Sequence, residues 1–218
     1  MTDRTLQLAD LRQLARSYFD GAASPAHDWH HVRRVERLAE RLVETVPDCD
    51  QRTVRLAVLL HDVGRPREDA GEIDDHAAWG AREARSILAA RGEPEDRIDG
   101  VCHAIRAHRY SMDPEPETRE AKLCADADRL DALGAVGLAR CFTYGGELGQ
   151  VIHDPAAGTG GEEADAGSAR TQYEHIHEKL LALPDQMYTD AGRRLARERG
   201  AVVEAFVERF DAEVAGER

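Results

Sequence analysis

The feature that most constrains the fold is the helical spacing of apolar residues along almost the whole chain. Residues three or four apart share one face of an α-helix, whereas the strict alternation typical of a half-buried strand is hard to find. The spacing predicts helices over 6–20, 28–46, 51–63, 76–91, 95–109, 118–131, 132–143, 170–183 and 188–214. The chain is therefore predicted to be an all-α helical bundle.

Breaks rich in Gly, Pro and acidic residues separate these segments, as expected for connecting turns. They have the sequences GAASP, VPDCD, GRPREDAGEID, RGEPED and MDPEPE. A length of 218 residues fits a single domain spanning 1–218. Within it we expect a core over about 20–143, a flexible loop rich in Gly and acidic residues over 144–169, and a C-terminal helical extension over 170–214.

The charge balance limits the partners that the protein can bind. It has 29 basic and 42 acidic residues, a net charge of −13, which argues against a binder of nucleic-acid polymers. Only two of the basic residues are lysines, Lys122 and Lys179. Together with many Ala and Arg residues, this composition is typical of a halophilic protein kept soluble in high salt. A strongly acidic mesophilic protein is the alternative.

The cysteines and the N-terminal stretch indicate the compartment. The four cysteines are scattered without a CxxC pair, so we expect buried thiols rather than disulfides or zinc ligands: Cys49, Cys102, Cys124 and Cys141. The first 20 residues carry charges throughout, and no apolar run approaches the roughly 20 residues that span a bilayer. We expect a cytoplasmic protein with no membrane partner, and the sequence leaves a homodimer open.

Several histidines are predicted to face the interior of the bundle. The apolar run Val54–Leu60 ends in His61 and Asp62, and burying such a pair is costly unless both groups are paired or bind a metal. His31, His76 and His108 each continue the apolar stripe of a predicted helix. Imidazole combined with carboxylate suits divalent transition metals. The spacing therefore predicts a metal site in the bundle core.

A further carboxylate ligand is expected from the segment 122–135. Asp126, Asp128 and Asp131 are all candidates, because apolar residues surround most of this helix and periodicity does not choose between them. Glu72, Asp74 and Asp75 lie in the predicted loop after His61–Asp62, and we expect solvation to be their main role.

Five segments together resemble the HD-domain metal-dependent phosphohydrolases, and most closely their small, stand-alone branch linked to nucleotide hydrolysis. They have the sequences HDWHHVRRVERLA, LLHDVGR, DDHAAWGAREARSIL, IRAHRYS and CADADRLDALGAVGLAR. The later segment YEHIHEKLLALPDQMYTDAGRRLARERGAVVEAFVERF is similar to the C-terminal helices of that branch. The resemblance covers residues 20 to 212.

The resemblance implies a set of metal ligands. The family's four defining ligands correspond to His31, His61, Asp62 and Asp128, with Asp126 as the alternative to Asp128. His76 and His108 stand where some members bind a second metal ion. Alternatively, these two histidines bind phosphate or orient water. The implied cofactor is one divalent ion, or two, chosen from Mn, Mg, Fe, Co, Ni and Zn.

The implied activity is that of a metal-dependent phosphohydrolase on a small anionic phosphorylated substrate, with a nucleotide favoured. Water activated by the metal releases phosphate or pyrophosphate. The candidate catalytic residues are Asp62, His76 and His108. The candidate phosphate-binding residues are Arg34, Arg65, Arg109, Lys122 and Arg129. Two other classes stay open: a di-iron oxygenase of the HD fold, and a non-catalytic regulatory module that binds metal or nucleotide.

Overall fold

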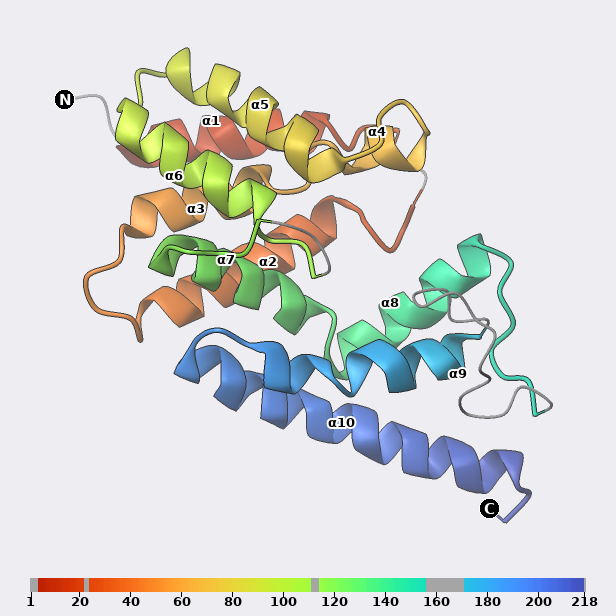
Figure 1. The fold of residues 1–218 in the computed structure, drawn as a ribbon. Helices are drawn as coiled ribbons and strands as arrows, with labels where there is room; N and C mark the ends of the chain where they lie inside the picture. Colours follow the sequence, from red (N-terminus) through yellow and green to blue (C-terminus); the bar gives the residue numbers. More distant parts are fainter. Residues whose placement is uncertain (1–3, 22–23, 111–113, 156–170, 218) are drawn as a thin grey trace. The chain divides into compact units, whose positions relative to one another are not determined.

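Helices make up most of the part of the chain that the structure describes. The computed structural model describes residues 4–21, 24–110, 114–155 and 171–217. In these ranges the β-structure is limited to one isolated parallel bridge between Val151 and Thr171 (Figure 1). The all-α prediction is confirmed. The chain divides into two compact units, Met1–Asp128 and Arg129–Arg218.

The first unit is a bundle of packed helices. In order they are α1 (Arg4–Ser17), α2 (Trp29–Val43), α3 (Gln51–Leu60), α4 (Arg65–Asp69), α5 (His76–Ala89), α6 (Glu95–Arg106) and α7 (Arg119–Asp131), whose last residues belong to the second unit. In Figure 1, α5 and α6 lie side by side, and α3 packs against both α2 and α6. Fully buried residues such as Leu42, Leu59 and Ile105 fill the core between them.

The second unit contains the remaining elements. They are α8 (Gly134–Glu147), α9 (Gln172–His175), a π-helical turn η1 (Ile176–Leu180), a 3-10 turn η2 (Leu183–Gln186) and α10 (Asp190–Val214). The long helix α10 packs against α8 and η2. Phe206 and Phe210 on α10 contact Phe142 and Tyr173, so aromatic rings form part of this packing.

Three aspartates fix where the helices that carry functional candidates begin. Asp28 accepts a hydrogen bond from the backbone N–H of His31 at 2.9 Å, which caps α2. Asp50 caps α3 by accepting from the N–H groups of residues 52 and 53. Asp75 accepts from residues 77 and 78 and caps α5 directly before His76. Such caps satisfy N–H groups that have no partner inside the helix, and they therefore set the position of His31 and His76.

Some predicted boundaries were wrong. The segment GRPREDAGEID, predicted as a break, contains the short helix α4, because Pro66 lies in its first turn, where a missing N–H costs nothing. The predicted helix 170–183 is instead divided into α9, η1 and the start of η2. The predicted loop 144–169 begins later, since α8 extends to Glu147, and residues 156–170 of that loop lie outside the described residues.

The prediction of buried thiols is confirmed for three of the four cysteines. All four are free thiols, with Cys102, Cys124 and Cys141 buried and Cys49 half-buried. Burial raises the pKa of the Cys141 thiol to about 11, which keeps it protonated and unreactive near neutral pH. Among the described helices, none combines the length and the apolar character needed to cross a bilayer.

Candidate metal centre

Six histidine and aspartate side chains converge inside the first unit. They come from α2, from the turn after α3, from the start of α5, from the segment after α6, and from α7. The residues are His31, His61, Asp62, His76, His108 and Asp128, called the His–Asp cluster below. All but Asp128 are buried, and the Asp128 side chain is 26% exposed. Asp128 therefore forms the most exposed edge of the cluster.

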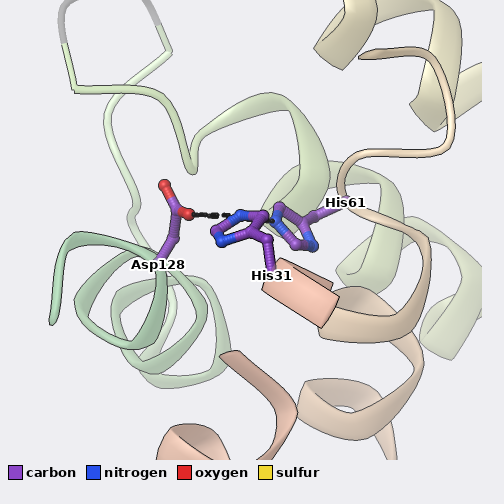
Figure 2. Close-up of side chains that lie close together, drawn as sticks. All are labelled: His31, His61 and Asp128. Carbon is purple, nitrogen blue, oxygen red and sulfur yellow. Dashed lines mark hydrogen bonds and ion pairs between the residues drawn. The ribbon is translucent and has the colours of Figure 1, made fainter. Parts of the chain in front are cut away.

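One corner of the cluster joins three side chains from three separate segments (Figure 2). His31 Nε2 lies 3.3 Å from His61 Nε2 and 3.2 Å from Asp128 Oδ1. The gap between His61 Nε2 and Asp128 Oδ1 is 3.8 Å. These three donor atoms all lie within 4.8 Å of one another, close enough to share one metal ion. The neighbouring Asp126 is also fully buried, but it does not belong to this group.

Asp62 lies between two pairs of imidazoles. Its Oδ2 atom is 3.4 Å from His31 Nε2 and 3.5 Å from His61 Nε2. Its Oδ1 atom faces the opposite pair, at 3.3 Å from His76 Nε2 and 3.6 Å from His108 Nε2. Each carboxylate oxygen therefore has its own pair of nitrogen donors. This geometry can hold one ion on either side of Asp62.

The hydrogen bonds behind two of the rings show that the donor set fits a cation. His61 Nδ1 donates to Val58 O at 2.9 Å, and His108 Nδ1 donates to Ile105 O at 2.6 Å. A carbonyl oxygen only accepts, so in the neutral ring the lone pair is on Nε2. Both Nε2 atoms face Asp62, whose oxygens also carry lone pairs. A divalent ion between them replaces this repulsion with coordination.

The protonation states also suit metal binding. Burial lowers the pKa of His61 to about 4, so this ring is neutral and able to bind metal near neutral pH. Burial opposes ionisation of Asp62, but the surrounding imidazoles, His61 first among them, outweigh it and hold the pKa of Asp62 well below its ordinary value. For Asp128 burial is likewise outweighed, mainly by the hydrogen bond from His31, and the pKa is lowered.

Glu68 on α4 is a functional candidate that the sequence reasoning missed. His76 Nδ1 lies 2.7 Å from Glu68 Oε2, and the backbone N–H of His76 donates to Glu68 Oε1 at 3.1 Å. Burial disfavours a charged His76, but hydrogen bonding to Asp62 and the charges of Asp62 and Glu68 prevail and raise its pKa. A carboxylate behind a histidine in this way orients the ring toward a metal. The only sequence signal was Pro66 followed by acidic residues, which is typical of a helix start.

Two of the predicted phosphate-binding arginines lie beside the cluster. Arg65 Nη1 is 3.5 Å from Glu68 Oε2, and Arg109 Nη1 is 3.4 Å from Glu68 Oε1. Arg109 also lies 3.4 Å from Asp75 Oδ1. Asp75 is therefore more than the solvated loop residue that was expected, since it caps α5 and contacts Arg109. Glu68 thus contacts His76 and both arginines, although the shortest contact of Arg65 is its hydrogen bond to Asp69 Oδ1, at 2.8 Å.

The other predicted phosphate-binding residues lie elsewhere. Arg129 is buried, donates to Gln186 O at 2.5 Å and stacks 4.7 Å from the centre of the Tyr188 ring, so it stabilises the second unit. Lys122 is half-buried on α7, and no ion pair within the described ranges links it to the cluster. Arg34 lines a separate cavity.

A helical bundle whose core presents His and Asp donors from several helices defines a metal-binding class of protein. The HD-domain family model matches residues 28–133. YpgQ of Bacillus subtilis is 35% identical over 197 residues, covering 88% of this chain and 87% of YpgQ. Ribonuclease Y 2 of Bdellovibrio bacteriovorus is 30% identical over 122 residues, 56% of this chain but 21% of that protein.

Solved structures agree with the sequence comparison. The crystal structure of an HD-superfamily hydrolase from Bacillus thuringiensis has a TM-score of 0.75 and 31% identity, covering 98% of this chain and 99% of that one. B. subtilis YpgQ crystallised in complex with ADP has a TM-score of 0.71 and 30% identity, covering 96% and 98%. The chain belongs to the HD-domain hydrolases.

Proposed function

We propose that the protein is a metal-dependent phosphohydrolase that cleaves a nucleotide and releases phosphate or pyrophosphate. The observation that carries this proposal is the position of Asp62, whose two oxygens face two separate pairs of imidazoles. A divalent ion held by these residues would stabilise negative charge on a phosphoryl oxygen and would lower the pKa of a water bound to it.

The residues of the cluster have different roles in this proposal. His31, His61, Asp62 and Asp128 hold the metal. Asp62 also orients the attacking water, since its carboxylate contacts both histidine pairs. His76 and His108 either hold a second ion or position water and protonate the leaving oxygen. No hydroxyl or thiol nucleophile is needed, because water is the attacking group.

Arg65 and Arg109 are the proposed phosphate-binding residues. Both lie within 3.5 Å of Glu68, which in turn contacts His76. Guanidinium groups match phosphate oxygens with two parallel hydrogen bonds. Both are paired with carboxylates in the structure, Arg65 with Glu68 and Asp69, and Arg109 with Glu68 and Asp75. A bound phosphate would take the place of some of these contacts, in a chain whose net charge of −13 otherwise repels an anion.

Two observations support a nucleotide as the substrate. The related YpgQ was crystallised with ADP, which contains a phosphate anhydride bond of the type proposed for cleavage. The net charge of −13 disfavours long nucleic acids, although the chain also shares similarity with part of a ribonuclease. A small nucleotide meets both constraints.

The test is a screen for phosphate and pyrophosphate release from ribo- and deoxynucleoside mono-, di- and triphosphates. Protein stripped with a chelator is assayed alone and with Mn, Mg, Fe, Co, Ni or Zn restored. We expect release to depend on metal and to fall about a thousandfold or more in His61→Ala, since a buried ligand is lost. His103→Ala is the matched control, because His103 lies outside the cluster and accepts a hydrogen bond from the N–H of Glu117.

Other results would replace the proposal. Release without metal, or equal release by His61→Ala, would contradict it. The same histidine and aspartate donors also suit iron, so oxygen uptake by iron-loaded protein without phosphate release would establish the oxygenase class instead. Binding of metal and ADP without turnover would establish a regulatory module.

A further inference from the structure

A second candidate binding site lies between the end of α1 and the start of α2. It is an open cavity of about 680 Å³, within the size range of pockets for small molecules. Its lining residues are Arg16, Phe19, Asp20, Asp28, Trp29, His30, Arg33, Arg34 and Arg37. None of them belongs to the His–Asp cluster.

The cavity and the cluster lie on different faces of α2. The lining residues of α2 share one face, since positions four apart lie above one another: Trp29, Arg33 and Arg37, with His30 and Arg34 beside them. His31 belongs to the buried face together with Val35, Leu38 and Leu42. A ligand in the cavity therefore contacts α2 from the side away from His31.

The cavity is basic in a strongly acidic protein. Four arginines and two aspartates line it, while the chain has a net charge of −13. Asp28 is already engaged, because it accepts the capping hydrogen bond from His31 N. Arg33 is paired with the buried Glu36, which also accepts from Arg12. The unpaired positive charge therefore comes from other arginines.

Arg16 and Arg37 carry that charge. Both side chains are exposed, and neither forms a hydrogen bond or ion pair with another residue in the described part of the chain. Two such guanidinium groups, one from α1 and one from α2, line the same cavity and can each bind phosphate oxygens. Within the described residues, the structure thus provides two cations that the fold itself does not use.

An aromatic wall accompanies these cations. Trp29 is half-buried and its ring contacts Phe19, with a centroid separation of 6.0 Å. Phe19 is buried and also lines the cavity, so its contact with Trp29 restricts the movement of the indole. A planar base can stack on an indole held in this way. Phosphate-binding and base-stacking groups therefore meet in one cavity.

We propose that this cavity binds a nucleoside polyphosphate at a site separate from the metal centre, with its phosphates on Arg16 and Arg37 and its base against Trp29. Binding in this cavity does not require hydrolysis at the His–Asp cluster, and would occur equally in a protein that turns over no nucleotide.

The test is calorimetric titration of ADP into the full-length protein in the presence of a chelator. We expect Arg16→Ala/Arg37→Ala to weaken ADP binding at least about tenfold, because two charge-assisted contacts are removed. The matched control is Arg41→Ala/Arg82→Ala, which removes the same two charges from exposed positions of α2 and α5 outside the cavity. The control should stay within about twofold of the unaltered protein, because those arginines contact no ligand in the cavity.

A second measurement locates the ligand. Trp29 and Trp79 are the two tryptophans of the chain, so Trp79→Phe leaves Trp29 as the fluorescent reporter. We expect ADP to quench it, and expect inorganic pyrophosphate and adenosine each to bind at least about tenfold more weakly than ADP. Absence of ADP binding under chelation, equal loss in both double variants, or pyrophosphate binding as tightly as ADP would each overturn the proposal.

The two proposals, hydrolysis at the His–Asp cluster and nucleotide binding in the cavity, can fail separately. Metal-dependent hydrolysis with an unchanged maximal rate in Arg16→Ala/Arg37→Ala, together with lost ADP binding under chelation, supports both. Lost hydrolysis in His61→Ala with retained ADP binding under chelation supports a cavity independent of the metal centre. If ADP binding instead disappears in His61→Ala, the separate site is excluded.

Discussion

At the scale of single residues, one carboxylate organises the candidate centre. Asp62 presents a different oxygen to each pair of histidines, and each contact is between 3.3 and 3.6 Å. Because His61 and His108 use Nδ1 to donate to backbone carbonyls, their Nε2 lone pairs face Asp62. The centre is thus held in place by the backbone before any ion binds.

Glu68 should act as a positioning residue for His76. Glu68→Gln removes the negative charge that lies 2.7 Å from His76 Nδ1, so the ring loses its strongest restraint. We expect affinity for Mn²⁺ to fall about 10- to 100-fold, as for other partners behind a ligand. Calorimetric metal titration measures this.

The control for this prediction is Glu72→Gln. Glu72 is exposed and pairs with Arg67 rather than with the cluster. It removes the same charge from a nearby loop and should leave the affinity for Mn²⁺ unchanged. Equal losses in the two variants would show that net charge, and not the contact with His76, sets the affinity.

His175 should make the free energy of unfolding depend on pH. Burial and the charge of Lys179 lower its pKa to about 4. In the unfolded chain the ordinary value is about 6.5, so the unfolded state takes up a proton first as the pH falls. The contribution of His175 to the free energy of unfolding is therefore fully present above about pH 6.5 and is lost progressively toward pH 4.

The measurement is urea unfolding of the protein and of His175→Gln at pH 7.5 and pH 5. Allowing for partial exposure of the ring, we expect the free energy of unfolding to fall by about 1 kcal/mol more in the original protein than in the variant on acidification. Equal losses of unfolding free energy in both proteins would rule out His175 as the source of the pH dependence.

At the scale of helices, close backbone approach places His76 beside the His61–Asp62 turn. A Cβ at Gly64 would lie 2.6 Å from His76 O and 3.0 Å from His76 Cα. These are backbone atoms of the first residue of α5, so they cannot move without moving the helix. Gly64 has an ordinary φ of −87°, so the requirement is for space and not for an unusual conformation.

Gly64→Ala should therefore lower the free energy of unfolding by about 1 to 3 kcal/mol and weaken Mn²⁺ binding. The matched control is Gly80→Ala, one turn into α5, where the nearest atom to the new Cβ is His61 O at an ordinary 3.6 Å. Because Ala favours a helix interior over Gly, this control should be neutral or up to about 1 kcal/mol more stable. Urea unfolding and metal titration compare the two variants. Similar losses of unfolding free energy and of Mn²⁺ affinity in both would show that the close approach at Gly64 is not the cause.

Sequence periodicity was sufficient for helices and for inward-facing histidines, but not for contacts that depend on the course of a connecting turn. The positions of His31 and the His61–Asp62 pair follow from apolar stripes. Choosing Asp128 required the family resemblance, because both Asp126 and Asp128 lie on a helix surrounded by apolar residues. Glu68 was missed because its contact with His76 depends on how the turn after α3 leads into α4, which spacing does not encode.

At the scale of the whole molecule, the negative charge and the basic sites have opposite consequences. The net charge of −13 makes the chain repel itself, while arginines near Glu68 and in the cavity on α2 are predicted to attract anions. Salt screens both effects. Screening should therefore stabilise the fold and weaken anion binding in the same solution.

Raising KCl from 0.1 to 1 M shortens the screening distance from about 10 to about 3 Å. Because repulsion among 42 acidic residues weakens, we expect the Tm to rise, as the halophile-like composition also predicts. ADP binding under chelation should weaken over the same range, because its phosphates are attracted by charge. In Arg16→Ala/Arg37→Ala the salt dependence of the remaining ADP binding should be shallower, since fewer cations take part. A falling Tm would contradict the self-repulsion argument, whereas ADP affinity independent of salt would contradict charge-based binding in the cavity.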